Sequence, residues 1–273
     1  VSAPSQQSAF AVGGVTFQMK QLGKSSKFEY TVEPFTEDFT GALAWQELGK
    51  RILAAAGMHA DSHGFGMKQL MPQNMAWVLS RMTISMNEMP KVNEKYAVDT
   101  WIRNIYRTFT DRCFAILRPD NTAYGYAYTT WALINMETRM PVNLENLPDG
   151  GFAKWIDDEK ICQVSDNSRI RVKESEPSRV ITAYYSDIDI NRHVNSIRYI
   201  EHMLDLFPQE QYTGHPLANL EIAYHGEALY GDSLALYKQC VSPGIWDVEV
   251  RMLPREDETG REKKICSCRM TFK

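Results

Sequence analysis

The stretch Ser186–Phe207, which reads SDIDINRHVNSIRYIEHMLDLF, decides how the rest of the chain is interpreted. Its second part carries apolar residues at spacings of three and four, which predicts an amphipathic helix that Pro208 ends. The preceding run, Arg179–Tyr185, is β-branched and aromatic, as in a strand. Polar side chains therefore gather where a strand passes into a helix N-terminus, whose unpaired N–H groups suit a developing oxyanion. These side chains are Asp187, Asp189, Asn191, His193 and Asn195.

The alternating residues Asp189, Asn191 and His193 supply a carboxylate, an amide and an imidazole that titrates near neutral pH. Any one of them alone would more commonly be a helix cap or a solvated surface group. Capping needs only one such residue, so the set of three favours an active site. The carboxylate would act as a charge or base, and the amide as a donor to a carbonyl oxygen.

The composition is that of a globular protein long enough for two ordinary domains. The chain has 273 residues, of which 44% are hydrophobic and 23% charged. The net charge of −4 gives no global reason to expect nucleic acid binding. No apolar run is long enough to cross a bilayer, and the five scattered cysteines favour reduced thiols. We therefore expect a cytoplasmic protein that binds neither nucleic acid nor membrane.

The first half of the chain is predicted to be one strand and one helix followed by several strands. Residues 1–24 are small and polar and are expected to form a flexible lead-in, so the first unit spans residues 25–145. The helix is expected over residues 41–56, ending at Gly57. Because no helices separate the later strands, their sheet should be mainly antiparallel. The predicted strands cover residues 27–35, 74–87, 95–109, 112–118 and 123–137.

The second half repeats this outline after a linker. Residues 146–177 are rich in Pro, Gly and charge and are interpreted as the linker, with a short helix near residues 152–161. Residues 178–273 form the second unit. Its predicted elements are a strand at 179–185, a helix at 193–207 and strands near 218–226, 233–241, 245–253 and 263–273.

The repeat can be aligned through two hairpins. Superposing Ile84–Tyr96 on Ile222–Leu234 brings Glu227 opposite Met89. The first helix likewise opens with Phe39-Thr40-Gly41 where the second has its polar cluster. Two copies of one strand–helix–sheet unit, an α+β fold, are the simplest account of the length. We infer that the second copy carries out the chemistry and the first binds an apolar group.

Methionine is abundant, at 13 residues, and many methionines lie in the first half beside tryptophans. Ordinary core packing explains this distribution as well as a flexible pocket for an alkyl chain does. If the pocket exists, the residues expected to bind the substrate there are Leu48, Ile52, Met75, Trp77 and Met89.

A second polar cluster, HADSH, contains His59, Asp61 and His63 in a segment that reads as a Gly-rich loop. The cluster lacks a fourth ligand at helical spacing, so a surface loop is expected there rather than a metal site. The sequence also lacks a P-loop, a dinucleotide fingerprint and a GxSxG motif. We expect neither a metal nor a cofactor.

The motif SDIDINRHVNSIRYI resembles the DxNxHVNN-xxYI signature of the plant and bacterial acyl-ACP thioesterases. Supporting matches are NMAWVLSRM, YAVDTW, TTWALINMETRMPVNL and LEIAYHGE followed by GDS, so the resemblance covers most of the chain from about Phe28 onward. It implies a tandem double hotdog, in which each unit is an antiparallel sheet wrapped around one long helix. The N-terminal unit would bind the acyl chain and the C-terminal unit would be catalytic.

By this resemblance Asp189, Asn191, His193 and Glu227 take the catalytic positions. Plant members often place a Cys directly after the Glu, but Ala228 stands here, which rules out a thiol nucleophile at that position and favours attack by water. The implied reaction is hydrolysis of fatty acyl-ACP to a free fatty acid, as in fatty acid biosynthesis. Glu227 would activate water near His193, while Asn191 and the helix N–H groups would hold the carbonyl oxygen. Asp189 would fix this arrangement or share the base role.

Three alternatives remain open: an acyl-CoA thioesterase, a hotdog dehydratase, which the HVN helix start argues against, and a non-catalytic acyl-binding protein. Acyl carrier protein is acidic, so the ACP hypothesis requires a basic patch near the pocket mouth. Hotdog units usually pair, so a homodimer is one expected assembly, although the tandem already supplies a pair. Candidates for the basic patch are Arg103, Arg107 and Arg112, or the linker residues Lys154, Arg169, Arg171 and Lys173.

Overall fold

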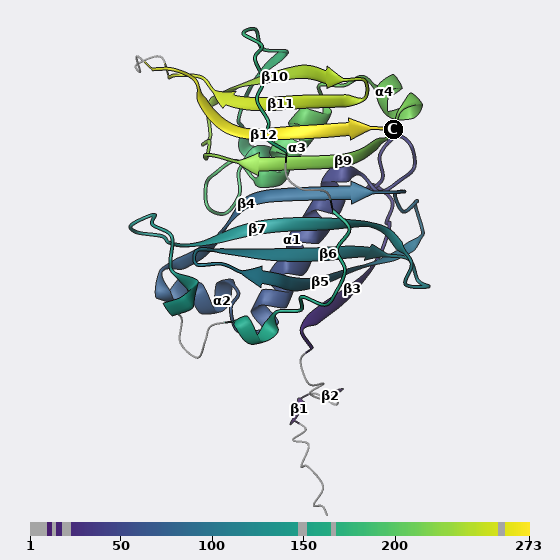
Figure 1. Ribbon diagram of the computed structural model, residues 1–273, viewed down its shortest axis with the longest axis vertical. Helices are drawn as coiled ribbons and strands as arrows, with labels where there is room; N and C mark the ends of the chain where they lie inside the picture. Colours follow the sequence, from purple (N-terminus) through teal and green to yellow (C-terminus); the bar gives the residue numbers. More distant parts are fainter. Residues whose placement is uncertain (1–9, 13–14, 18–22, 147–151, 165–167, 256–259) are drawn as a thin grey trace, which may run out of the picture.

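One antiparallel sheet runs through both halves of the protein (Figure 1), as seen in a computed structural model that describes residues 10–12, 15–17, 23–146, 152–164, 168–255 and 260–273. Its ten strands follow the order β3-β5-β6-β7-β4-β9-β12-β11-β10-β8. The first half contributes β3 (Ser25–Thr31), β4 (Met75–Met86), β5 (Lys95–Ile105), β6 (Phe109–Leu117) and β7 (Ala123–Asn135). The second half contributes β8 (Arg179–Thr182), β9 (Leu217–Tyr224), β10 (Ser233–Ser242), β11 (Ile245–Met252) and β12 (Lys263–Phe272). Two short strands, β1 (Phe10–Val12) and β2 (Val15–Phe17), pair separately.

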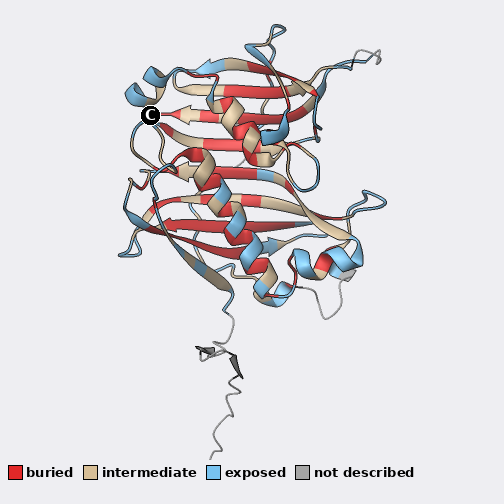
Figure 2. Ribbon diagram, turned by 180° about the vertical axis from the view of Figure 1, so that it is seen from behind, coloured by how far each residue is buried: buried red, intermediate tan, exposed pale blue. Residues whose placement is uncertain are grey.

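The halves join where β4 pairs with β9, in an antiparallel ladder that extends from Arg81 opposite Ala223 to Ser85 opposite Asn219. The two long helices, α1 (Trp45–Ser62) and α3 (Ser196–Leu204), cover the same face of the sheet (Figure 2). Shorter helices are α2 (Met67–Leu70), α4 (Gln209–Gly214), η1 (Met71–Gln73), η2 (Leu144–Asn146), η4 (Ala153–Trp155) and η5 (Tyr185–Asp187).

The main core lies between these helices and the sheet. Leu48 and Ile52 of α1 and Ile200 of α3 are fully buried there, as their spacing predicts. The helices approach closely at Gly49, where an added Cβ would lie 2.8 Å from Cδ1 of Ile197. A larger residue at position 49 would therefore push α1 away from α3.

Each half contributes five strands to one antiparallel sheet and one long helix that packs on it. This arrangement confirms the predicted α+β, tandem hotdog architecture. Some element bounds differ from the prediction. β3 ends at Thr31 rather than residue 35, because a turn follows in which Phe35 adopts a φ of 74°. The helix predicted over 193–207 is shorter at both ends and spans Ser196–Leu204. It starts at Ser196 because the side chain of Asn195 caps it by accepting from the N–H of Ile197 at 2.9 Å.

The helix predicted to end at Gly57 instead continues to Ser62. Its stop signal is Gly64, whose φ of 84° lies in the left-handed region that glycine adopts most readily. The segment predicted as a surface loop is therefore the last turn of α1. This prediction was wrong: His59 and His63 are both buried, because that turn packs against Phe65 and Trp155.

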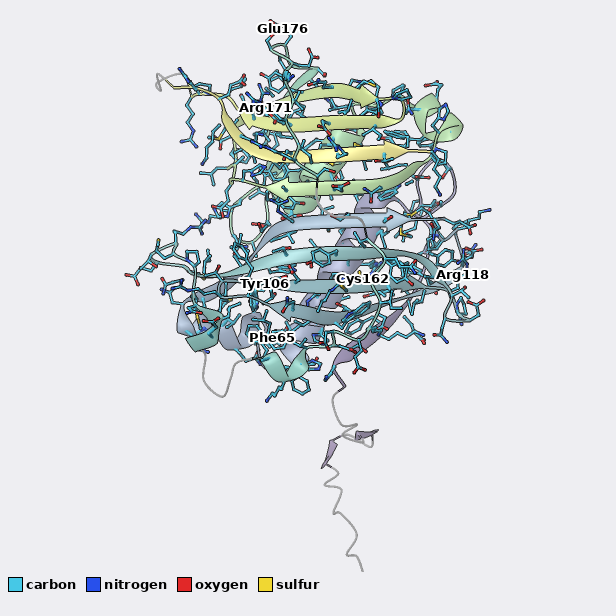
Figure 3. All side chains as sticks on the ribbon, viewed as in Figure 1. Phe65, Tyr106, Arg118, Cys162, Arg171 and Glu176 are labelled. Atoms are coloured by element: carbon cyan, nitrogen blue, oxygen red, sulfur yellow. The ribbon has the colours of Figure 1, made fainter. Side chains whose placement is uncertain are left out.

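The linker crosses the face of the sheet that the helices leave uncovered (Figure 3). Cys162 packs there against Trp101 and Cys113, and Val172 packs against Tyr237 in the second half. The short helix predicted near residues 152–161 is the brief η4. Most of the predicted lead-in and parts of the linker, residues 147–151 and 165–167, lie outside the described residues.

Candidate active site

The polar cluster lies in a tight turn ahead of α3. The N–H of Asp189 donates to the carbonyl of His193 at 2.9 Å, and Oδ1 of Asp189 accepts from the N–H of Asn191 at 2.8 Å. Arg192 takes a φ of 64° to close the turn. The backbone therefore presents Asn191 and His193 from a conformation that the Asp189 side chain stabilises.

The first half contains the same turn without the chemistry. The N–H of Asp38 donates to the carbonyl of Ala42, and Oδ1 of Asp38 accepts from the N–H of Thr40, both at 2.8 Å. Asp38 is thus the counterpart of Asp189, whereas Thr40 and Ala42 stand where the second half has Asn191 and His193. A carboxylate therefore holds this turn even in the half that lacks the imidazole.

The loop that follows β9 brings Glu227 beside the turn. Isolated bridges pair His193 with Leu229, and Ala42 with Lys91 in the first half. Glu227 therefore falls opposite Met89, in the register that the repeat predicts. Nε2 of His193 lies 3.5 Å from Oε2 of Glu227, which is close enough for a shared proton or a bridging water after a small adjustment.

Arg139 is a partner of Glu227 that sequence reasoning missed. Its Nη2 donates to both carboxylate oxygens of Glu227 at 2.6 Å. Arg139 follows β7 in a turn held by the side chain of Asn135, and its φ is 59°. Both partners are about half exposed, so the pair contributes at most ~1 kcal/mol to folding, and its main effect is to orient the carboxylate.

Asn191 lies between two cavities. An open cavity of about 700 Å³ is lined by Asn191, His193, Glu227 and Arg139. A second cavity of about 260 Å³, mostly apolar, lies between α1 and the sheet of the first half. Both cavities are lined by Leu53, Trp77, Trp131 and Asn191, so the polar cavity and the apolar cavity adjoin.

Two residues that line the open cavity, Asn191 and Ser196, each have a donor without an acceptor among the described residues. The side-chain amide of Asn191 makes no hydrogen bond within the described part of the chain. At the start of α3, the N–H groups of Ile197 and Arg198 are both used by Asn195, which leaves the N–H of Ser196 unengaged among the described residues. An amide side chain and a helix N-terminal N–H are the components of an oxyanion site.

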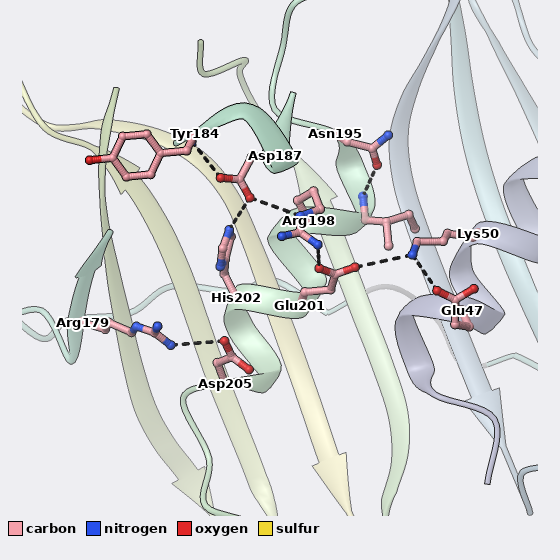
Figure 4. A network of polar contacts seen from close by, with 11 residues as sticks. Glu47, Lys50, Arg179, Tyr184, Asp187, Asn195, Arg198, Glu201, His202 and Asp205 are labelled. Atoms are coloured by element: carbon pink, nitrogen blue, oxygen red, sulfur yellow. Dashed lines mark hydrogen bonds and ion pairs between the residues drawn. The ribbon is translucent and has the colours of Figure 1, made fainter. Parts of the chain in front are cut away.

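The carboxylate of Asp187 connects the segment before the turn to α3 (Figure 4). Its carboxylate is buried and accepts from the N–H of Tyr184, from Nε of Arg198 and from Nε2 of His202, at 2.9, 3.2 and 2.9 Å. Burial acts to raise the pKa of Asp187, but these hydrogen bonds outweigh it and hold the pKa below its ordinary value. Arg198 also contacts Glu201, which lies 3.8 Å from Lys50 of α1.

An Asp187→Asn variant should lose about 2 kcal/mol of folding free energy at neutral pH, because charge-assisted hydrogen bonds to two cationic or protonatable partners are lost. The folded-state pKa of Asp187 is lowered, so its contribution is fully present above the unfolded pKa near 4 and is lost as pH falls from there through the folded-state pKa. Urea unfolding at pH 7 and pH 3 checks this. A difference between variant and wild type that is as large at pH 3 as at pH 7 would contradict it.

The predicted substrate-binding residues fall into two groups. Met75 and Trp77 line the apolar cavity. Leu48 and Ile52 are fully buried in the main core, and Met89 packs against that core, so these three do not line it. The apolar cavity lies farther along α1 than the predicted set, beside the turn that was taken for a loop.

Arg112 is not part of a surface patch, contrary to the prediction. Only 5% of the surface of Arg112 is exposed, and the residue lines the apolar cavity. Arg103 and Arg107 are exposed. The cations that line the open cavity are instead Arg139 and Lys263.

Among the described residues, no group of three His, Cys, Asp or Glu side chains could hold a metal ion. None of the described helices has the length and apolar character that crossing a membrane requires.

The fold and the site together define a tandem hotdog protein with a carboxylate and an imidazole at the start of its second long helix. Two family models match the chain. The model of the acyl-ACP thioesterase N-terminal domain matches residues 23–147, and the model of the acyl-ACP thioesterase C-terminal domain matches residues 170–272. The chain therefore belongs to the acyl-ACP thioesterase family.

Comparison with individual proteins supports the same family. A crystal structure of an acyl-ACP thioesterase from Bacteroides thetaiotaomicron is 41% identical, covers 92% of this chain and 98% of that one, and superposes with a TM-score of 0.84. The 12:0-ACP thioesterase from Umbellularia californica shares the fold, with 15% identity over 93% of this chain and 99% of that one and a TM-score of 0.79. A palmitoyl-acyl carrier protein thioesterase from Cuphea hookeriana is 24% identical over 67% of this chain. The match covers 45% of that relative, so the chain spans about half the length of the curated relatives it matches.

Proposed function

We propose that the protein hydrolyses the thioester of a fatty acyl-acyl carrier protein and releases a free fatty acid. The observation that carries this proposal is that a polar cavity adjoins an apolar one: the Glu227–His193 pair lines an open cavity that shares Asn191 and Trp77 with the apolar cavity. A polar end for a thioester and an apolar end for its tail are what such a substrate requires.

In the proposed reaction Glu227 removes a proton from a water molecule as its oxygen adds to the thioester carbonyl carbon. The oxyanion that forms accepts from the amide of Asn191 and from the N–H of Ser196. When the carbonyl re-forms, the C–S bond breaks, and the sulfur leaves as a thiol with the proton that Glu227 or His193 returns. Asp189 holds the turn, and Arg139 orients the carboxylate of Glu227.

We further propose a division between the units. Residues 25–145 would hold the acyl chain in the apolar cavity, residues 146–177 would link the units, and residues 178–273 would carry the catalytic side chains. This division is supported by the origin of the lining residues, since Asn191 is the one residue of the second unit among the described residues that line the apolar cavity.

An acidic carrier would meet Lys263 at the open cavity. Lys263 begins β12 and packs beside Gly226, where an added Cβ would lie 3.2 Å from its Cε. A cation at the rim raises the rate at which an acidic partner associates, and salt screens this effect. Because the chain also belongs to the acyl-ACP thioesterase family, the carrier protein, rather than coenzyme A, is the proposed acyl donor.

A Lys263→Glu variant should lower kcat/KM on acyl-ACP by roughly 5–10-fold at low salt, and less at high salt. The measurement compares acyl-ACP with acyl-CoA of the same chain length at two salt concentrations. Lys173→Glu is the matched control, because Lys173 is exposed on the linker and does not line the open cavity. Equal rates on both substrates would favour the acyl-CoA alternative, and a larger effect at Lys173 would move the carrier site to the linker.

The overall activity can be tested by mass spectrometry of free fatty acids released when the protein is expressed in a bacterial host. Acyl chains that bind without turnover would favour the non-catalytic alternative. The homodimer, the cytoplasmic location and the absence of nucleic acid and membrane partners stay predictions.

A further inference from the structure

Arg112 is a buried cation in the wall of the apolar cavity. It lies in β6, where it pairs in register with Ile102 of β5 and Thr129 of β7, near the middle of the first-half sheet. The neighbouring walls of the cavity are aromatic or aliphatic, including Phe65, Leu70 and Phe152. Arginine is almost never fully buried unless it is paired, so its presence here needs a reason.

The guanidinium has no carboxylate partner. Nη1 donates to Nδ1 of His59 at 3.0 Å and to Oγ1 of Thr100 at 3.3 Å. Within the described part of the chain these are its only hydrogen bonds, and no Asp or Glu there lies within ion-pair distance. The N–H groups of Nε and Nη2, which form one edge of the planar fork, have no acceptor among the described residues.

The charge of Arg112 is not balanced by its neighbours. Burial, followed by the charges of Arg112 and His63, lowers the pKa of His59 to about 3, so His59 is neutral and accepts from Arg112 at Nδ1. Burial lowers the pKa of Arg112 to about 9, which still leaves it a cation at neutral pH. The C-terminus of α1, where His59 lies, supplies only a fractional negative charge.

Arg112 lies on the side of Asn191 where the acyl tail of the proposed substrate would be. Asn191 lines both cavities, whereas Arg112 lines only the apolar one. An acyl group whose carbonyl lies at Asn191 would therefore direct its tail into the chamber that contains Arg112. Figure 3 shows Phe65, another wall residue, at the end of the first half that lies away from the β4–β9 junction.

We propose that Arg112 recognises the far end of the acyl chain, and that the preferred substrate carries an oxygen acceptor there, a carboxylate above all. This inference rests on the proposed function. The Nε and Nη2 edge would bind such a carboxylate through two parallel hydrogen bonds. A chain that ends in a methyl group would keep water from the same N–H groups without replacing their hydrogen bonds, which is unfavourable.

The first test compares acyl-ACP substrates of equal carbon number that end in methyl, hydroxyl or carboxyl. The wild-type protein should hydrolyse the carboxyl-ended substrate with a kcat/KM at least ~10-fold above the methyl-ended one, with the hydroxyl-ended substrate between them. The Arg112→Met variant should lose this order, because the carboxyl-ended substrate loses its two hydrogen bonds and the methyl-ended one no longer covers an unpaired cation. The matched control, Arg103→Met, changes an exposed arginine of β5 and should keep the order.

A second test does not require hydrolysis. Binding of α,ω-dicarboxylic acids and of monocarboxylic acids of equal length can be followed by the fluorescence of Trp77 and Trp131, which line the cavity. Tighter binding of the diacids that depends on Arg112 would support the inference even if no thioester were hydrolysed, so failure of the proposed function is seen separately. Wild-type protein that prefers the methyl-ended compounds, or binds both equally, would overturn the inference whether or not the variant folds.

Discussion

The Glu227→Ala variant should hydrolyse an acyl thioester at least ~100-fold more slowly than the wild-type protein, because general-base assistance is typically worth that much or more. Glu227 is exposed at the cavity and its ion pair with Arg139 adds little to stability, so folding should be nearly unchanged. Single-turnover measurements with a saturating enzyme concentration would report the chemical step directly. Glu227→Gln, which keeps the shape and removes the charge, should lose as much.

The chain offers a close control for this experiment. Glu88 lies in the equivalent hairpin of the first half and pairs with Arg118 at 2.7 Å, as Glu227 pairs with Arg139. Glu88→Ala removes an exposed carboxylate from the same kind of ion pair, but in the half of the protein that lacks His193. The Glu88→Ala variant should have normal turnover. Near-wild-type hydrolysis by Glu227→Ala would refute the base assignment.

The Asn191→Ala variant should lose roughly 100- to 1,000-fold in kcat, or about 3 kcal/mol of transition-state stabilisation, with a smaller change in KM. The reason is that its amide is a donor to charge that develops only as water adds to the carbonyl. Thermal unfolding should be close to that of the wild type, because the side chain makes no hydrogen bond within the described residues.

Thr40 provides the matched control for Asn191, since it occupies the same place in the equivalent turn of the first half. Thr40→Ala should leave kcat unchanged. If Asn191→Ala instead raised KM and left kcat intact, Asn191 would contribute to uniform substrate binding rather than to the oxyanion site.

Much of the arrangement around the site could be predicted because it is repeated. Two copies of one turn and one hairpin gave the register that puts Glu227 opposite Met89, and the bridges of His193 and Ala42 have that register. The function of Asp189 was harder to predict, because a carboxylate that caps a turn and one that acts as a base have the same sequence pattern. The equivalent hydrogen bonds of Asp38 support the proposed positioning role over a base role.

Other features depend on contacts between distant segments. Arg139 is 88 residues from Glu227 in sequence, so no spacing rule could pair them. The end of α1 was misjudged because Gly57 is tolerated inside a helix when the following turn is buried by tertiary contacts. The burial of Arg112 did leave a signal: Arg112, Phe114 and Ile116 alternate along β6, and the last two are plainly core residues.

The β4–β9 ladder limits how a ligand can reach the interior. Swinging the two units apart would break the backbone hydrogen bonds of this ladder and leave unpaired edges on β4 and β9, which makes a hinge opening between the halves unfavourable. A tail held in the apolar cavity would instead enter and leave past the residues that this cavity shares with the open cavity beside Glu227. Release of the longest products is therefore where we expect this protein to be slowest.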